Sequence, residues 1–187
     1  DTVYPHQLTM TATPIPRTLA MSMYAHLDYS VIDELPPGRK PITTVAIAES
    51  RRDDIVERIR ENCQHGAQVY WVCSLIEESE VLQSQAATDT HVYLQTQLTD
   101  LNIGLLHGRL KSAEKDSVMQ DFINKKINVL VATTVIEVGV DVPNASLMVI
   151  ENAERFGLAQ LHQLRGRVGR GEKQSSCVLL YKAPLGD

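Results

Sequence analysis

The side chains with the clearest chemical potential are Gln163, Arg167 and Arg170, which lie close together near the end of the sequence. If this stretch is helical, spacings of four and three residues place all three on one face. Guanidinium groups form paired hydrogen bonds with phosphates, so such a face suits a polyanion. Gly166 and Gly169 lie between them, and because each costs a helix about 1 kcal/mol relative to alanine, we interpret them as allowing close approach of another surface or a phosphate. The alternative is a solvated basic helix end, where arginine complements the helix dipole.

Polar residues also follow two of the predicted strands. His107, Gly108 and Arg109 follow one strand, and Thr133 and Thr134 follow another. Ligands of open α/β sheets bind at the carboxyl ends of the strands, where a helix N-terminus favours phosphate. These residues are therefore candidates for phosphate contacts. The alternatives are a helix cap for the threonine pair and a structural role for the histidine.

Two motifs of a complete nucleotide site are absent from the sequence. There is no glycine-rich loop ending in Gly-Lys-Ser or Gly-Lys-Thr, and no acidic pair in a magnesium-binding context, because Glu77 and Glu78 read as acids at a helix start. Cys63, Cys73 and Cys177 are scattered, so no metal site is expected. If the chain serves a nucleotide-driven activity, it supplies half of the site, with arginine fingers that reach a nucleotide bound elsewhere. Such a finger contributes about 10³- to 10⁵-fold in turnover.

The composition is that of a soluble globular domain. The 187 residues are 43% apolar and 22% charged, with a formal net charge of -5. A nucleic-acid surface must therefore be a local patch. No apolar run approaches the roughly 18 residues of a membrane span, and no signal peptide opens the sequence. The scattered cysteines fit reduced thiols in a cytosolic protein.

From residue 41 onward, predicted strands alternate with predicted helices. This order predicts an α/β fold in which helices cover both sides of a parallel β-sheet. The predicted strands span residues 42–48, 69–73, 103–106, 129–133, 147–150 and 177–181. Helices are predicted at residues 51–65, 77–98 and 112–125. Ser50 and Ser112 are the predicted N-caps of the first and third helices. If the second helix is interrupted, the break would occur at residues 87–90.

Residues 1–40 are interpreted as a separate segment. A strand is predicted at residues 8–13 and a helix at 17–27, and Pro36-Pro37-Gly38 marks a linker. The segment is either an N-terminal extension or the tail of a preceding domain. We favour the tail, because a lone strand leaves its own edges unpaired. The sequence does not begin with methionine, so we expect it to be part of a longer chain.

Four segments resemble motifs of the superfamily 2 helicases and translocases, in the order that this superfamily has them. They are Thr11–Pro14 (motif III), Tyr70–Ser74 (motif IV), Ala132–Pro143 (motif V) and Gln163–Arg170 (motif VI). Three longer segments, Thr11–Ala20, Ile32–Lys40 and Gly157–Gly166, resemble the RecG family of bacterial branched-DNA helicases. The Mfd family of transcription-repair coupling translocases shares the first and third of these segments. The resemblance to the RecG family covers essentially the whole chain.

This resemblance implies a protein with two RecA-like lobes and with ATP and Mg²⁺ between them. Residues 41–187 would be the second lobe, the helicase C-terminal lobe, and residues 1–40 the end of the first lobe with a linker. The implied roles are catalysis for Gln163, Arg167 and Arg170, nucleotide binding for Gly139 and Asp141 with the two arginines, contact with the DNA backbone for Thr133, Thr134, His107, Gly108 and Arg109, and coupling for Thr11, Ala12 and Thr13. We expect both arginines to be largely exposed, on the face that the first lobe covers.

The implied function is that of an ATP-dependent DNA helicase that remodels stalled replication forks and Holliday junctions in recombination and repair. Its partners would be branched DNA and the first lobe and wedge domain of the same chain, with no membrane. We expect a monomer in the bacterial cytoplasm, at the nucleoid, and an inactive isolated fragment. The alternatives are the lobe of an Mfd-like translocase and a RecA-like module that binds DNA or a partner without catalysis.

Overall fold

The computed structural model describes residues 8, 10, 30–34, 40–73, 79–133, 142–171 and 174–183. The chain divides into two compact units, Asp1–Pro36 and Pro37–Asp187. The strand predicted at 8–13 falls almost wholly outside the described residues, and the helix at 17–27 and the Pro36–Gly38 linker fall wholly outside them. All the helices and strands of the described residues belong to the second unit.

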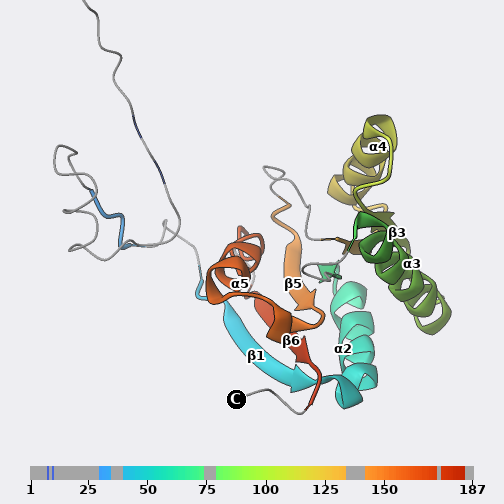
Figure 1. Ribbon diagram of the computed structural model, residues 1–187, viewed down its shortest axis with the longest axis horizontal. Coiled ribbons are helices and arrows are strands. Elements are labelled where there is room, and N and C mark those ends of the chain that lie inside the picture. The colour runs from blue at the N-terminus through green and yellow to red at the C-terminus, as the bar shows by residue number, and fades with distance from the viewer. Residues whose placement is uncertain are drawn as a thin grey trace, which may run out of the picture. The chain divides into compact units, whose positions relative to one another are not determined.

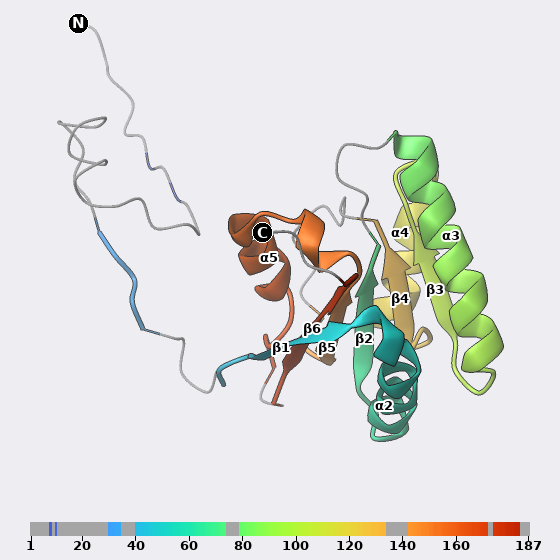
Figure 2. The same cartoon turned by 60° about the horizontal axis from the view of Figure 1, so that its bottom comes forward.

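The second unit is built on one sheet of six parallel strands, which confirms the predicted α/β fold. In Figure 2 the strands run side by side in the order β1-β6-β5-β2-β4-β3. Their bounds are β1 Thr43–Ala48, β2 Gln68–Val72, β3 Ile103–Leu106, β4 Val129–Ala132, β5 Ala145–Ile150 and β6 Ser176–Tyr181. Each of the six strands predicted from residue 41 onward is present, with ends that differ by at most two residues.

Helices cover both sides of this sheet (Figure 1). Their bounds are α2 Arg52–Gln64, α3 Glu80–Gln97, α4 Ser112–Ile123 and α5 Leu158–Arg165, with short 3₁₀ turns η1 Glu49–Arg51 and η2 Ala153–Arg155. No helix of the described residues is both long enough and apolar enough to cross a membrane.

The inner strands form because their sequences are apolar on both faces. Every residue of β2, β4 and β5 is buried, as expected for parallel strands with helices on either side. Along β2, Val69 and Trp71 face one core, which α2 and α3 complete. Tyr70 and Val72 face the other core, which α4 and α5 complete. The sheet is therefore a rigid platform for the loops at its two edges.

Two predicted N-caps are wrong, and the break considered at 87–90 does not occur. Ser50 lies within η1 and is not the N-cap of α2, because the chain leaves β1 through a tighter turn before that helix begins. Ser112 is the first residue of α4, and its N-cap is Lys111, whose N–H donates to a glutamate of the first turn. Helix α3 runs without a break at 87–90, because Ala87 and Thr90 are buried on its inner side.

Replacing Ser79 by alanine is expected to lower the free energy of unfolding by about 1 kcal/mol. Ser79 is the N-cap of α3, and its Oγ accepts a hydrogen bond from the Leu82 N–H at 3.4 Å. Ser112→Ala is the matched control, because this serine lies inside α4 and alanine is the best helix former. Urea unfolding of both variants checks the prediction, and an equal loss of stability in the two would contradict it.

Candidate functional site

The stretch Gln163–Arg170 is not one helix. Helix α5 begins after Gly157, whose N–H donates to the Gln160 side chain at 3.1 Å and so closes the first turn. The helix ends at Arg165, with Gly166 as the C-cap. Gln163 therefore lies on the helix, whereas the two following arginines lie beyond its end.

Residues 166–171, which we call the arginine turn, carry Arg167 and Arg170. Gly169 has a φ of +76°, a left-handed conformation that ends any continuation of the helix. The turn also brings Val168 into the core, where it is fully buried. The prediction that Gln163 and the two arginines share one helical face is therefore wrong, since burial of Val168 and the left-handed glycine redirect the chain.

Two glycines let the arginine turn lie against residues that precede three strands. A Cβ on Gly169 would lie 2.9 Å from Cγ1 of Ile42 and 3.5 Å from Cβ of Ser175, and a Cβ on Gly171 would clash with the Pro143 carbonyl. These three residues come just before β1, β6 and β5. The turn therefore lies at the end of the sheet where the parallel strands begin, which we call its amino edge; the end where they finish is its carboxyl edge. The glycines were predicted to allow the close approach of another surface or of a phosphate. Gly169 allows the first of these, and the surface that it contacts belongs to the same lobe.

The three side chains with predicted catalytic roles differ in exposure. Gln163 and Arg170 are exposed, whereas Arg167 is half-buried. The Nε of Arg170 donates to the Gly166 carbonyl at 3.4 Å, which orients its side chain along the turn. The expectation of exposure is therefore met by Arg170 and only partly by Arg167. The turn therefore carries the exposed Arg170 at the surface of the lobe.

A second group of predicted residues lies at the opposite, carboxyl edge of the sheet. His107, Gly108 and Arg109 follow β3, and Arg109 is exposed. The absence of a Cβ at Gly108 leaves room for the Glu80 carboxylate. Burial, then the positive charges of Arg109 and Lys115, lower the pKa of His107 below its usual value, which favours the neutral imidazole. Of this group, Arg109 is thus the candidate for a charged phosphate contact.

Of the remaining predicted residues, the structure describes only Thr133. Thr133 follows β4 at the same edge, but it is only 3% exposed, and its N–H donates to the Leu106 carbonyl at 3.1 Å. The others lie outside the described residues: Thr134, Gly139, Asp141, Thr11, Ala12 and Thr13. Among the residues that the structure does describe, no group of three or more side chains is arranged to hold a metal ion.

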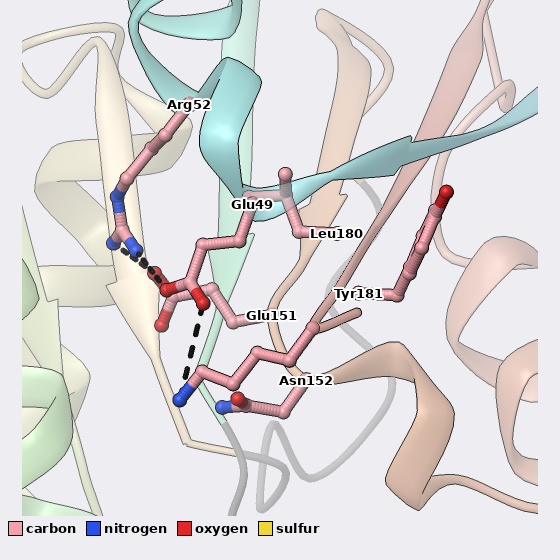
Figure 3. A pocket seen from close by; sticks show the side chains of 7 residues that line it. Glu49, Arg52, Glu151, Asn152, Leu180 and Tyr181 are labelled. Atoms are coloured by element: carbon pink, nitrogen blue, oxygen red, sulfur yellow. Dashed lines mark hydrogen bonds and ion pairs between the residues drawn. The ribbon is translucent and has the colours of Figure 1, made fainter. Parts of the chain in front are cut away.

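A charged cluster that sequence reasoning missed also lies at the carboxyl edge (Figure 3). Arg52 at the start of α2 pairs with Glu151, the residue directly after β5, and with Glu49 at 3.4 Å. The guanidinium carbon of Arg52 lies 5.2 Å from the ring centroid of Trp71 and 5.1 Å from that of Tyr93. The position of Glu151 after a buried strand was a detectable signal. Nothing in the sequence indicated its partner.

The hollow beside this cluster is not a ligand pocket. It encloses essentially no volume, about 0 Å³, and it is lined in part by Glu49, Lys182 and Tyr181. Sites for small molecules in proteins usually enclose about 300–1,000 Å³. The cluster is therefore a packed ionic contact between elements rather than a binding site.

Comparisons with known proteins agree with the fold of the second unit. A family model described as "Helicase conserved C-terminal domain" matches residues 50–172. Proteins named ATP-dependent DNA helicase RecG are similar to the chain: that of Escherichia coli is 68% identical over 97% of the chain and 26% of its own length, and that of Aquifex aeolicus is 51% identical over 95% and 22%. The chain thus spans about a quarter of the length of these relatives.

Two solved structures resemble the chain. A structure of RecG bound to a three-way DNA junction matches with a TM-score of 0.74 and 47% identity, over 91% of this chain and 22% of that one. Domain 2 of a DEAD-box helicase bound to an RNA duplex matches with a TM-score of 0.61 and 21% identity, over 75% of this chain and 54% of that one. The second likeness supports the fold alone.

Proposed function

The chain belongs to the helicase conserved C-terminal domain family, and on that basis we propose that it is the second motor lobe of a RecG-type, ATP-dependent DNA helicase. The observation that carries the proposal is the identity of 68% with RecG of Escherichia coli over 97% of the chain. The full-length protein would remodel stalled replication forks and Holliday junctions in DNA repair and recombination.

The arginine turn is the proposed contribution of this lobe to ATP hydrolysis. Arg170 and Arg167 would bind phosphate oxygens as charge develops on them, and Gln163 would help to position the site. Gly139 and Asp141 would lie near the nucleotide. ATP and Mg²⁺ would be held mainly by the first lobe. Two features support this division: the sequence lacks a phosphate-binding loop, and the described residues offer guanidinium groups but no carboxylate cluster for the metal ion.

The carboxyl edge is the proposed surface for DNA. The exposed Arg109, with His107 and Gly108, would follow the phosphate backbone, and Thr134 would lie beside it, next to the buried Thr133. Contacts of this kind position a protein on DNA without reading its sequence. ATP would thus be bound at the arginine turn, and DNA would be bound at the ends of β3 and β4.

The remaining features of the full-length protein are proposed with the function. Residues 1–40 would be the end of the first lobe, where Thr11, Ala12 and Thr13 would couple hydrolysis to DNA. A wedge domain of the same chain would hold the fork. The protein would act as a monomer in the bacterial cytoplasm, at the nucleoid.

ATP turnover of the full-length protein, measured with forked DNA and with linear duplex of the same length, tests this function. We expect the forked DNA to stimulate turnover at least several-fold more, because a branched-DNA helicase engages the junction. Equal stimulation by linear duplex would favour the Mfd-like translocase instead. An absence of turnover with any DNA would favour the non-catalytic binding module.

A further inference from the structure

Helix α5, which leads into the arginine turn, is held weakly along its own length. None of its residues is fully buried, and only Leu161 and Leu164 pack against the core, both of them half-buried. Leu158 at its first position is 86% exposed. The orientation of the helix therefore depends on how the chain is anchored before it and after it.

The anchor after α5 is the arginine turn itself, through the buried Val168. The anchor before α5 is the connection 151–157, which we call the β5–α5 connection. It begins at Glu151, whose N–H donates to the Val72 carbonyl at 2.9 Å. Asn152 follows with a left-handed φ of 49°, and Ala153 and Phe156 are buried. A residue in the left-handed region keeps this conformation where the surrounding contacts hold it, and Glu151 supplies contacts directly before Asn152.

The carboxylate of Glu151 is fixed by groups from the other side of the sheet. Its Oε1 accepts from the Nη2 of Arg52, and its Oε2 accepts from the Thr90 hydroxyl at 3.3 Å. The side chain of Glu151 is only 10% exposed. Burial, and then the negative charge of Glu151, raise the pKa of the neighbouring Cys73 thiol, which therefore stays protonated beside it. Arg52 is the only described cation that pairs with this carboxylate.

Arg52 is in turn held in one position. Its Nη1 donates to Glu49 at 3.4 Å, and the rings of Trp71 and Tyr93 lie on its guanidinium group, in the geometry of cation–π contacts. The Tyr93 hydroxyl donates to Asp53 at 3.0 Å, which ties α3 to α2. The helices on one side of the sheet thus fix the start of the connection to α5 on the other side.

We propose that Arg52 and Glu151 are positioning residues for the arginine turn: their ion pair fixes the β5–α5 connection, and through α5 it sets where Arg170 and Arg167 lie. The proposal rests on the proposed function, because it gives the pair a role in ATP turnover beyond holding the fold. A merely structural pair would stabilise the lobe without a specific effect on the arginines.

The test is a double-mutant cycle in the full-length protein, with Arg52→Lys and Arg170→Ala. Lysine keeps the charge but loses the planar fork and its stacking on two rings. We expect Arg52→Lys to lower kcat for DNA-stimulated ATP hydrolysis on the order of tenfold, since small displacements of catalytic groups have effects of this size, and to leave the Kd for DNA unchanged. In the Arg170→Ala background the same change should have less than about a twofold effect, because the guanidinium that it positions is already gone. Glu151→Gln, which keeps the volume, should behave in the same way.

Arg60→Lys is the matched control. Arg60 lies on the same helix and also contacts two carboxylates, Glu57 at 2.6 Å and Asp100 at 3.6 Å, but it touches nothing that leads to α5. This variant should leave kcat within twofold. Thermal unfolding of every variant tells whether the fold is intact.

Two results would overturn the positioning role. One is an equal loss of kcat from Arg52→Lys in both backgrounds, which is the additive behaviour of a general effect on the fold. The other is unchanged turnover in both Arg52→Lys and Glu151→Gln. Near-normal turnover in Arg170→Ala alone would instead reject the proposed arginine finger, and the positioning role would be rejected with it.

Discussion

Replacing Arg170 by alanine in the full-length protein is expected to lower DNA-stimulated ATP turnover by about 10³-fold or more. An arginine finger contributes this much because it stabilises charge on the transferred phosphoryl group, and a factor of 10³ corresponds to about 4 kcal/mol of transition-state stabilisation. Arg170 is exposed on the arginine turn, so the change should leave the lobe folded. Steady-state phosphate release with saturating forked DNA measures the effect, and the Kd for DNA should remain unchanged.

Arg51→Ala is the control for this experiment. Arg51 is another exposed arginine, and its partner is Asp54 at 2.9 Å, three residues along the chain. Exposed ion pairs of this kind contribute about 0–1 kcal/mol, so turnover and stability should hardly change. If Arg170→Ala kept turnover within a few-fold of the unmodified protein, the arginine turn would not be part of the ATP site.

Gly169→Ala is expected to lower the free energy of unfolding by about 2–3 kcal/mol and to lower turnover at the same time. A side chain at a positive φ costs about 1–2 kcal/mol, and the new Cβ would lie 2.9 Å from Cγ1 of Ile42. Relief of that contact would move the arginine turn away from the amino edge of the sheet. Urea unfolding of the lobe and ATP turnover of the full-length protein measure the two effects.

Gly66→Ala separates the cost of the positive φ from the cost of the contact with Ile42. Gly66 has a φ of +75°, close to that of Gly169, but a Cβ there would meet nothing within 4 Å. This variant should lose only the roughly 1–2 kcal/mol of the backbone term and should keep normal turnover. Ile42→Ala should restore part of the turnover that Gly169→Ala loses, because it removes the contact atoms. Equal destabilisation by the two glycine variants would show that the arginine turn tolerates the added methyl group.

The sheet was predictable because a parallel strand that is buried on both faces needs a continuous apolar run. The run from Val69 to Val72 could belong to no surface element, and the same holds for Val129–Ala132. Strand order and the pairing of β1 with β6 have no such signal, since they depend on contacts between distant segments.

The helix ends and the candidate site were harder to predict, for local reasons. A serine before a helix can be a cap, as Ser79 is, or can lie inside the first turn, as Ser112 does, and the backbone decides between them. The spacing of Gln163, Arg167 and Arg170 suited a helix, but the burial of Val168 ended it early. The pairing of Arg52 with Glu151 joins residues 99 positions apart, and no pattern in the sequence connects them.

The pairing of β1 with β6 has a consequence for the synthesis of the protein. Among the described residues, β1 is the first strand of the lobe to be translated and its only partner is the last strand, β6. Gln174, two residues before β6, donates a hydrogen bond to the Thr43 hydroxyl from 131 residues away. Contacts of such long range form late in folding. A chain whose synthesis ends before residue 176 would therefore lack β6 and would leave β1 and one side of β5 unpaired. Both strands could then pair with another chain and aggregate.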